Sequence, residues 1–155
     1  MKYAFYNTII GDIGICYENE TILSLKKTDI NKTILNEKNN FTDNVHKQLV
    51  DYLNGNITTF NLNLAPKGTD FQKKVWNELC NIPYGETRSY KEIAKLIGNK
   101  NACRAVGMAN NKNPIHIIIP CHRVIGSNGK LVGYAGGIDM KHYLLDLETN
   151  NKSKI

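Results

Sequence analysis

The sequence predicts an α/β fold in which a small N-terminal α/β domain, a short antiparallel sheet with a helix, precedes a mostly helical C-terminal domain. That second domain contains a helix-turn-helix of winged-helix-like layout. Two observations support this fold. Short alternating apolar runs end before residue 26, whereas capping boxes and helical spacing dominate after residue 68. A stretch with proline and glycine at 65–68 separates the two patterns. We therefore place one domain at 1–64, a second at 65–149 and a polar tail at 150–155.

Length and composition are those of an ordinary soluble globular protein. The chain has 155 residues and a mass of 17.5 kDa, with 41% hydrophobic and 22% charged residues. Its net charge of +6 and pI near 9.1 favour an anionic partner, and nucleic acid is the usual one. No apolar run reaches membrane-spanning length, and the first residues lack the apolar core of a signal peptide. We expect a cytoplasmic protein with no membrane contact.

The four cysteines predict neither a disulfide framework nor a metal site. Thiols stay reduced in the cytoplasm. The cysteines form no C-x-x-C pair and show no matched spacing to histidines; they are Cys16, Cys80, Cys103 and Cys121. Cys16 and Cys80 are interpreted as packing residues.

In the N-terminal domain, alternating runs predict strands at 3–8 and 14–17, with a third at 21–25. Polar residues dominate 26–40, which predicts a loop. A helix is predicted over 44–53, because Val45, Leu49, Val50 and Leu53 share one face and Asn54-Gly55 ends it.

In the C-terminal domain, two capping boxes predict helix starts. Thr69 with Gln72 opens a helix that the stretch 82–85 ends, and Ser89 with Glu92 opens a short helix that ends at Gly98. A third helix is predicted over 102–109, and Asp139 is expected to cap a last helix.

Helix, glycine-containing turn and helix is the layout of a DNA-binding helix-turn-helix. The second helix of this pair carries small residues and one arginine, namely Ala102, Cys103, Arg104, Ala105, Val106 and Gly107. Such a face lets the backbone approach DNA closely without reading sequence, and Arg104 can enter the base stack. The alternative is a buried helix that packs tightly through its small residues.

The stretch 117–125 holds the candidate nucleophile. Cys121 and His122 lie between β-branched apolar residues, which predicts buried, strand-like backbone interrupted by Pro120. A thiol beside an imidazole is a candidate activated thiolate. Adjacent side chains on a regular strand point to opposite faces, so either the chain turns here or a water carries the proton. The alternative is a cysteine that packs as a small hydrophobe.

Several segments in this order and spacing resemble the O6-alkylguanine-DNA alkyltransferases. They are Ile-Pro-Tyr-Gly-Glu-Thr at 82–87, Ser-Tyr at 89–90, Arg-Ala-Val-Gly at 104–107, Asn-Pro at 113–114, Pro-Cys-His-Arg-Val at 120–124 and Gly-Tyr-Ala-Gly-Gly at 133–137. The resemblance covers nearly all of 66–148, which makes 65–149 the DNA-binding and catalytic domain.

The resemblance implies that Cys121 takes a methyl or other alkyl group from O6 of guanine, and from O4 of thymine, once per molecule and irreversibly. It also implies that His122 acts through a water as the base and that Glu148 orients His122. Tyr90 is then the proton donor to the departing guanine, and Lys141 assists that transfer. No cofactor and no metal are expected.

For DNA, the resemblance implies a monomer that binds duplex containing O6-alkylguanine through the minor groove and flips the damaged base. Arg104 replaces that base in the stack, and Asn113 pins the turn that carries the cysteine. The base pocket is walled by Tyr134, Ala135 and Gly136, with Val124 in backbone contact. The remaining expected DNA contacts are Ala102, Cys103, Ala105, Gly107, Tyr90 and Arg123.

Two other functions fit parts of the sequence. A thiol hydrolase or protease can use Cys121, His122 and Glu148, but it needs an oxyanion site and an open peptide groove that nothing in the sequence indicates. A DNA-binding regulator can use the helix-turn-helix alone. It predicts sequence-specific binding, which the small-residue helix disfavours.

Overall fold

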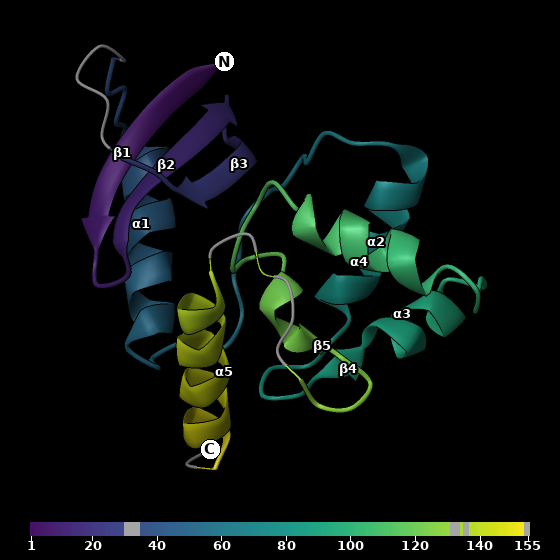
Figure 1. Ribbon diagram of the computed structural model, residues 1–155. Coiled ribbons are helices and arrows are strands. Elements are labelled where there is room, and N and C mark those ends of the chain that lie inside the picture. Colours follow the sequence, from purple (N-terminus) through teal and green to yellow (C-terminus); the bar gives the residue numbers. More distant parts are fainter. Residues whose placement is uncertain (30–34, 131–133, 135–136, 154–155) are drawn as a thin grey trace. The chain divides into compact units, whose positions relative to one another are not determined.

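The computed structural model describes residues 1–29, 35–130, 134 and 137–153. The chain divides into two compact units, Met1–Lys67 and Gly68–Ile155 (Figure 1). The break falls within the stretch of proline and glycine at 65–68. Among the described residues, no helix is long and apolar enough to cross a bilayer.

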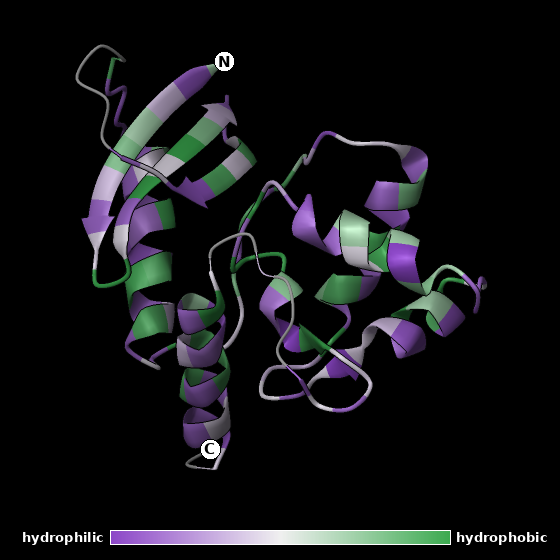
Figure 2. Ribbon diagram, in the orientation of Figure 1, coloured by the Kyte–Doolittle hydropathy of each residue, from purple (hydrophilic) through white to green (hydrophobic). Residues whose placement is uncertain are grey.

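The first unit contains the predicted antiparallel sheet. Its strands are β1 (Lys2–Thr8), β2 (Gly11–Glu18) and β3 (Thr21–Lys27), paired in the order β1-β2-β3. Figure 2 shows hydrophobic residues in these strands, with hydrophilic residues at the two ends of β1. Ala4, Ile15 and Leu25 lie side by side across the three strands and are buried on one face, because directly opposed residues on neighbouring strands point to the same face of a sheet.

Helix α1 (Asn40–Leu53) packs near β1 through an apolar face that includes Val45, Leu49 and Leu53. It begins four residues before the predicted start at 44. The reason is a capping box in which Asn39 accepts from the Thr42 amide and Thr42 accepts from the Asn39 amide. Threonine replaces the usual Glu or Gln in this box, so the sequence signature is weak.

The second unit is built on three helices, α2 (Asp70–Cys80), α3 (Tyr90–Leu96) and α4 (Cys103–Asn111). Both predicted capping boxes are present at the starts of α2 and α3. Helix α4 packs against both other helices, and the Trp76 indole N–H on α2 donates to the Ala109 carbonyl at 2.8 Å. The α3–α4 pair is the predicted helix-turn-helix, and Gly98 takes φ +82° in its turn.

Two short strands, β4 (Arg88–Ser89) and β5 (Val124–Ile125), pair in parallel. This pairing places the start of α3 beside the end of the stretch 117–125, which contains Cys121. Between α4 and β5 the chain forms turns and a 3₁₀ helix, η1 (Cys121–Arg123), so the prediction of strand-like backbone before Cys121 is wrong. Ile117 takes φ +70° and Pro120 lacks an N–H, and both features are incompatible with a regular ladder.

Helix α5 (Ile138–Lys152) is the last element. Asp139 does not cap it, contrary to prediction. Gly137 is the N-cap residue with φ +98° and no side-chain hydrogen bond, which places Asp139 inside the first turn. The helix also continues through Asn150 and Asn151 to Lys152, into residues predicted to form a polar tail.

Candidate active site

The backbone around Cys121 is a tight turn that local hydrogen bonds close. The Cys121 amide donates to the Ile119 carbonyl at 2.8 Å, and the Arg123 amide donates to the Pro120 carbonyl at 3.0 Å. Adjacent residues of a regular strand point their side chains to opposite faces. Because the chain turns at this point, that constraint does not apply to the side chains of Cys121 and His122. Cys121 is buried, with 1% of the residue's surface exposed.

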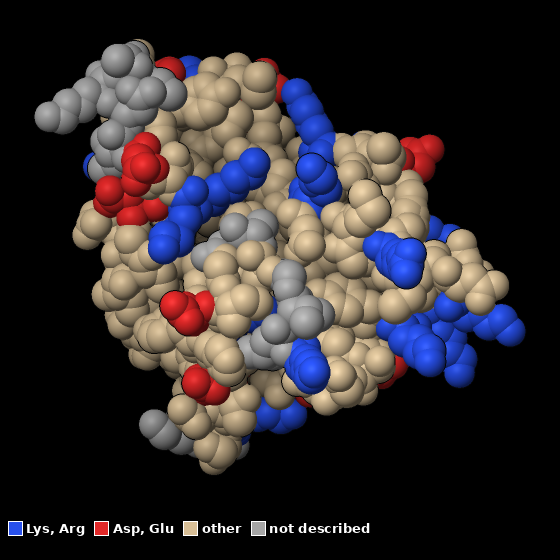
Figure 3. All heavy atoms as spheres, in the orientation of Figure 1, with Lys and Arg blue, Asp and Glu red and all other residues tan. Residues whose placement is uncertain are grey.

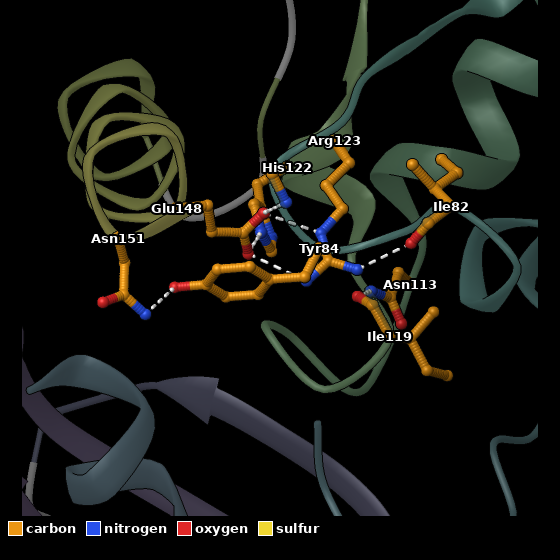
Figure 4. A network of polar contacts seen from close by, with 9 residues as sticks. Ile82, Tyr84, Asn113, Ile119, His122, Arg123, Glu148 and Asn151 are labelled. Carbon is orange, nitrogen blue, oxygen red and sulfur yellow. Dashed lines mark hydrogen bonds and ion pairs between the residues drawn. The ribbon is translucent and has the colours of Figure 1, made fainter. Parts of the chain in front are cut away.

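Two buried asparagines hold this turn from α4 and the segment after it. Asn113 donates to the Ile119 carbonyl at 2.8 Å (Figure 4). It also accepts from the Ile115 amide at 3.0 Å. Asn110 donates to the Cys121 carbonyl at 3.3 Å. Asn113, the residue expected to pin the turn, lies against the backbone two residues before Cys121. Asn110 was not among the predicted site residues, because a polar residue in the last turn of a helix is usually exposed.

His122 and Glu148 form a short buried contact between η1 and α5. His122 Nε2 lies 2.7 Å from Glu148 Oε2, and neither side chain is exposed by more than 1% (Figure 4). Arg123 completes the cluster, because its Nε and Nη2 donate to the two oxygens of Glu148 at 2.8 and 2.9 Å. The Gly85 amide donates to the same carboxylate at 3.3 Å.

Charges within this cluster determine its protonation. Burial alone raises the pKa of Glu148, but hydrogen bonds from His122 and Arg123 outweigh it and lower the pKa to about 2. Burial lowers the pKa of His122. At neutral pH the carboxylate is therefore ionised and the imidazole neutral. Since an ionised carboxylate only accepts, Nε2 carries the proton and Nδ1 is the basic nitrogen.

The thiol itself is protonated at rest. Burial raises the pKa of Cys121 to about 11, against the lowering effects of the Asn113 hydrogen bond and the Lys141 charge. Lys141 on α5 is fully buried and donates through Nζ to the Val124 carbonyl at 2.5 Å. Its burial lowers its pKa to about 8. Reaction at this cysteine therefore needs a base, and the neutral imidazole on the next residue is the nearest one in sequence.

Two tyrosines complete the surroundings of the thiol. Tyr134 is buried, and its pKa is raised by burial and then by its contact with Cys121. Tyr90 at the start of α3 is half-buried with its ring beside Gly107 of α4. Burial and then the electrostatic interaction with Cys121 raise its pKa, so its hydroxyl keeps its proton at neutral pH. Of the other predicted pocket residues, Val124 is buried, and Ala135 and Gly136 lie outside the described residues.

The small-residue face of α4 is open to solvent. Cys103, Arg104 and Ala105 are exposed and Ala102 and Gly107 are half-buried, while Val106 and Ala109 face the core. This arrangement disfavours the alternative in which small residues serve tight internal packing.

The segment from Arg88 to Lys112 holds six Lys or Arg and one Glu. Figure 3 shows basic side chains gathered at the right, where α3 and the loop after it lie in Figure 1.

Arg123 is placed differently from expectation. It was expected among the DNA contacts, but its guanidinium points inward to Glu148 and to the Ile82 carbonyl, and 8% of the residue is exposed. A buried guanidinium needs a carboxylate partner, and Glu148 supplies it.

Throughout the described part of the chain, no three His, Cys, Asp or Glu side chains cluster in a way that could hold a metal ion.

Comparisons with known proteins agree over both units. The family model described as "6-O-methylguanine DNA methyltransferase, DNA binding domain" matches residues 70–150. The model described as "6-O-methylguanine DNA methyltransferase, ribonuclease-like domain" matches residues 1–66. The methylated-DNA--protein-cysteine methyltransferase of Methanosarcina acetivorans is 50% identical over 96% of this chain and 98% of its own length. The protein of that name from Methanosarcina barkeri is 63% identical over 74% of this chain and 73% of its own.

Solved structures give the same result. Mycobacterium tuberculosis OGT in complex with DNA matches with a TM-score of 0.89 and 43% identity, over 97% of this chain and 94% of that one. Both domains of one family, in the same order, therefore account for nearly the whole sequence. The chain belongs to the 6-O-methylguanine DNA methyltransferase family.

Proposed function

We propose that this protein repairs DNA by transferring a methyl or other alkyl group from O6 of guanine, and from O4 of thymine, to the sulfur of its own Cys121. The observation that carries the proposal is the buried Cys121 thiol, followed directly by a neutral His122 whose proton-bearing nitrogen is bound to Glu148. The names of the relatives support the same reaction. A thioether is chemically stable, so each molecule reacts once.

In the proposed reaction, Nδ1 of His122 takes the Cys121 proton through a water molecule. The ionised Glu148 then stabilises the imidazolium, as in other His-carboxylate pairs. The sulfur lone pair forms a bond to the alkyl carbon while the bond from that carbon to O6 breaks. The electrons of the broken bond go to the guanine, which takes a proton from the Tyr90 hydroxyl. Lys141, buried beside Val124, assists that proton transfer.

The target atom is unreachable inside a stacked duplex, so we infer that the damaged base is flipped out before transfer. The exposed face of α4 then lies in the minor groove, and Arg104 fills the space left in the stack. Ala102, Cys103, Ala105 and Gly107 let the backbone approach the sugar-phosphate backbone closely. Tyr134 and Val124 wall the pocket that receives the base, and Ala135 and Gly136, which were expected beside them, lie outside the described residues.

The proposed partner is double-stranded DNA that contains the lesion, bound by a monomer through residues 65–149. All four cysteines are free, and the reaction needs a free thiol, so we place it in the reducing cytoplasm.

The test is the intact mass of the protein after mixing with a duplex that contains one O6-methylguanine. We expect a gain of one methyl group per protein that saturates at one and maps to Cys121. The Cys121→Ala variant gains nothing, whereas the Cys80→Ala variant, which removes an exposed cysteine, gains one methyl like the wild type. Tight binding to the lesion without a mass change would instead indicate a lesion-recognising protein. Sequence-selective binding without a mass change would indicate a regulator.

A further inference from the structure

The last turn of α5 lies against the loop that follows α2. Asn151 donates through Nδ2 to the Tyr84 hydroxyl at 3.1 Å (Figure 4), and the Gly85 amide donates to Glu148. Lys152 packs on Gly85 so closely that a Cβ there would lie 2.6 Å from the lysine Cδ. Gly85 also has φ +77°, which favours glycine. The loop and the end of α5 are therefore matched in shape.

The same loop holds the arginine of the active-site cluster. The Arg123 Cζ lies 5.6 Å from the centre of the Tyr84 ring, within the range of a cation–π contact. Arg123 Nη1 donates to the Ile82 carbonyl at 2.8 Å. The Tyr84 ring and the Ile82 carbonyl thus both contact the guanidinium whose other nitrogens bind Glu148. Tyr84 joins two groups, since its ring contacts Arg123 and its hydroxyl contacts Asn151.

We propose that Tyr84 and Asn151 are paired positioning residues for the alkyl transfer proposed above: their hydrogen bond fixes the Tyr84 ring against Arg123, and Arg123 in turn holds Glu148 in place to orient His122. Neither residue touches the reacting atoms. Each acts through Arg123, and the inference rests on the proposed function for its effect on rate.

Residue 151 lies just beyond the family match at 70–150, in the stretch that the sequence predicted as a polar tail. Tyr84 and Asn151 are 67 residues apart, so their contact depends on the docking of α5.

A loosened Arg123 has a predictable electrostatic effect. The Arg123 charge helps to lower the pKa of both His122 and Glu148. If the guanidinium moves away, both pKa values rise. As the pH is lowered, the His122 imidazole then becomes protonated at a higher pH than in the wild type. The charged groups that act on this pair are Arg123 on η1 and Lys141 on α5, and Tyr134 is in turn affected by Glu148. Changes at Tyr84 or Asn151 leave Lys141 and Tyr134 themselves unchanged.

The test uses the full-length protein with the variants Tyr84→Phe, Asn151→Ala and the double variant. Tyr84→Phe keeps the ring and removes only the hydroxyl, so it preserves the fold. The matched controls are Tyr143→Phe and Asn150→Ala, which change the same residue types at exposed positions of α5. The first measurement is the single-turnover rate of methyl transfer from a saturating O6-methylguanine duplex as a function of pH. The second is the ¹⁵N NMR titration of the His122 ring nitrogens.

We expect each single variant to slow transfer about three- to tenfold below neutral pH, which corresponds to one lost hydrogen bond. The acidic limb of the pH profile moves to higher pH, and the defect fades above neutral pH. The double variant is no slower than either single variant, because both changes remove the same contact. In the NMR titration, the His122 pKa rises in all three variants, and the controls match the wild type.

Three results would overturn the proposal: a defect of equal size at every pH, additive effects in the double variant, or an unchanged His122 titration. If the wild type transfers no methyl group, the proposed function fails. The nitrogen titration still decides whether Tyr84 and Asn151 set the state of His122, because it needs no DNA.

Discussion

His122 Nε2 lies 2.7 Å from Glu148 Oε2, and the two residues, 26 positions apart in the chain, are both buried. Their contact sets the tautomer of the imidazole and leaves Nδ1 as the base. A carboxylate in this role is expected to stabilise the positive charge that forms when the imidazole accepts a proton.

Replacing Glu148 with glutamine should slow alkyl transfer strongly. The amide cannot stabilise the imidazolium, and its oxygen and nitrogen can select the wrong tautomer. We expect a loss of about 10²- to 10⁴-fold in the single-turnover rate, the range typical of general-base catalysis. Asp146→Asn, on the exposed side of the same helix, is the control and should keep the wild-type rate. A Glu148→Gln rate within a factor of two of wild type would exclude the proposed role.

Stability should fall in acid because of Glu148. Its pKa is lowered from 4.5 to about 2 in the folded protein, so the ionised carboxylate stabilises the fold above about pH 4.5. That contribution, on the order of 3 kcal/mol, is lost as the pH falls from about 4.5 through about 2. Urea unfolding at a series of pH values measures it. The wild-type curve should drop more steeply over this window than that of Glu148→Gln, and parallel curves would contradict the assignment.

The thiol of Cys121 should be nearly inert towards alkylating reagents in the absence of DNA. With its pKa raised to about 11 by burial, only about one thiol in ten thousand is ionised at pH 7. Iodoacetamide followed by peptide mass mapping should label the exposed Cys103 long before Cys121 in the folded protein. In urea the difference should disappear. Equal labelling rates in the folded protein would mean that Cys121 is already activated at rest.

Asn113→Ala should weaken both the fold and the reaction. The change leaves the Ile119 carbonyl and the Ile115 amide without their partner, at a cost of about 2–4 kcal/mol for two buried polar groups. The cysteine turn then loses its anchor, and transfer slows. Asn77→Ala, at an exposed position of α2, should change neither the urea midpoint nor the rate. A stable Asn113→Ala protein with normal transfer would show that the turn holds itself.

Arg104→Ala should impair transfer only when the lesion is in a duplex. Arg104 is exposed on α4. Its side chain is needed to take the place of the damaged base only when that base has been flipped out of a duplex. We expect transfer from duplex DNA to fall about 5- to 100-fold, the range for losing one stacking contact. Transfer from free O6-methylguanine should be unchanged. Arg104→Lys keeps the charge but not the planar group, so it should stay impaired. Equal losses with duplex and free base would point to a folding defect.

The local parts of this protein could be read from its sequence. The capping boxes at Thr69 and Ser89 operate within four residues, so their signatures locate the starts of α2 and α3 without tertiary information. The alternating apolar runs of the first domain predict its sheet for the same reason. The neighbouring Cys121 and His122, and the motifs around them, likewise identify the reactive stretch because they are contiguous.

The tertiary structure alone decided how that stretch works. Proline and strand-like flanks predict extended backbone at Cys121, but side chains from α4 and from the segment after it close a turn instead. Arg123 looks like a surface arginine in the sequence, yet it is buried because Glu148 arrives from 25 residues away. Asn151 lies in an apparent tail, and only the docking of α5 brings it to Tyr84. Local sequence patterns report hydrogen bonds between near neighbours, whereas these contacts exist only after distant elements have packed together.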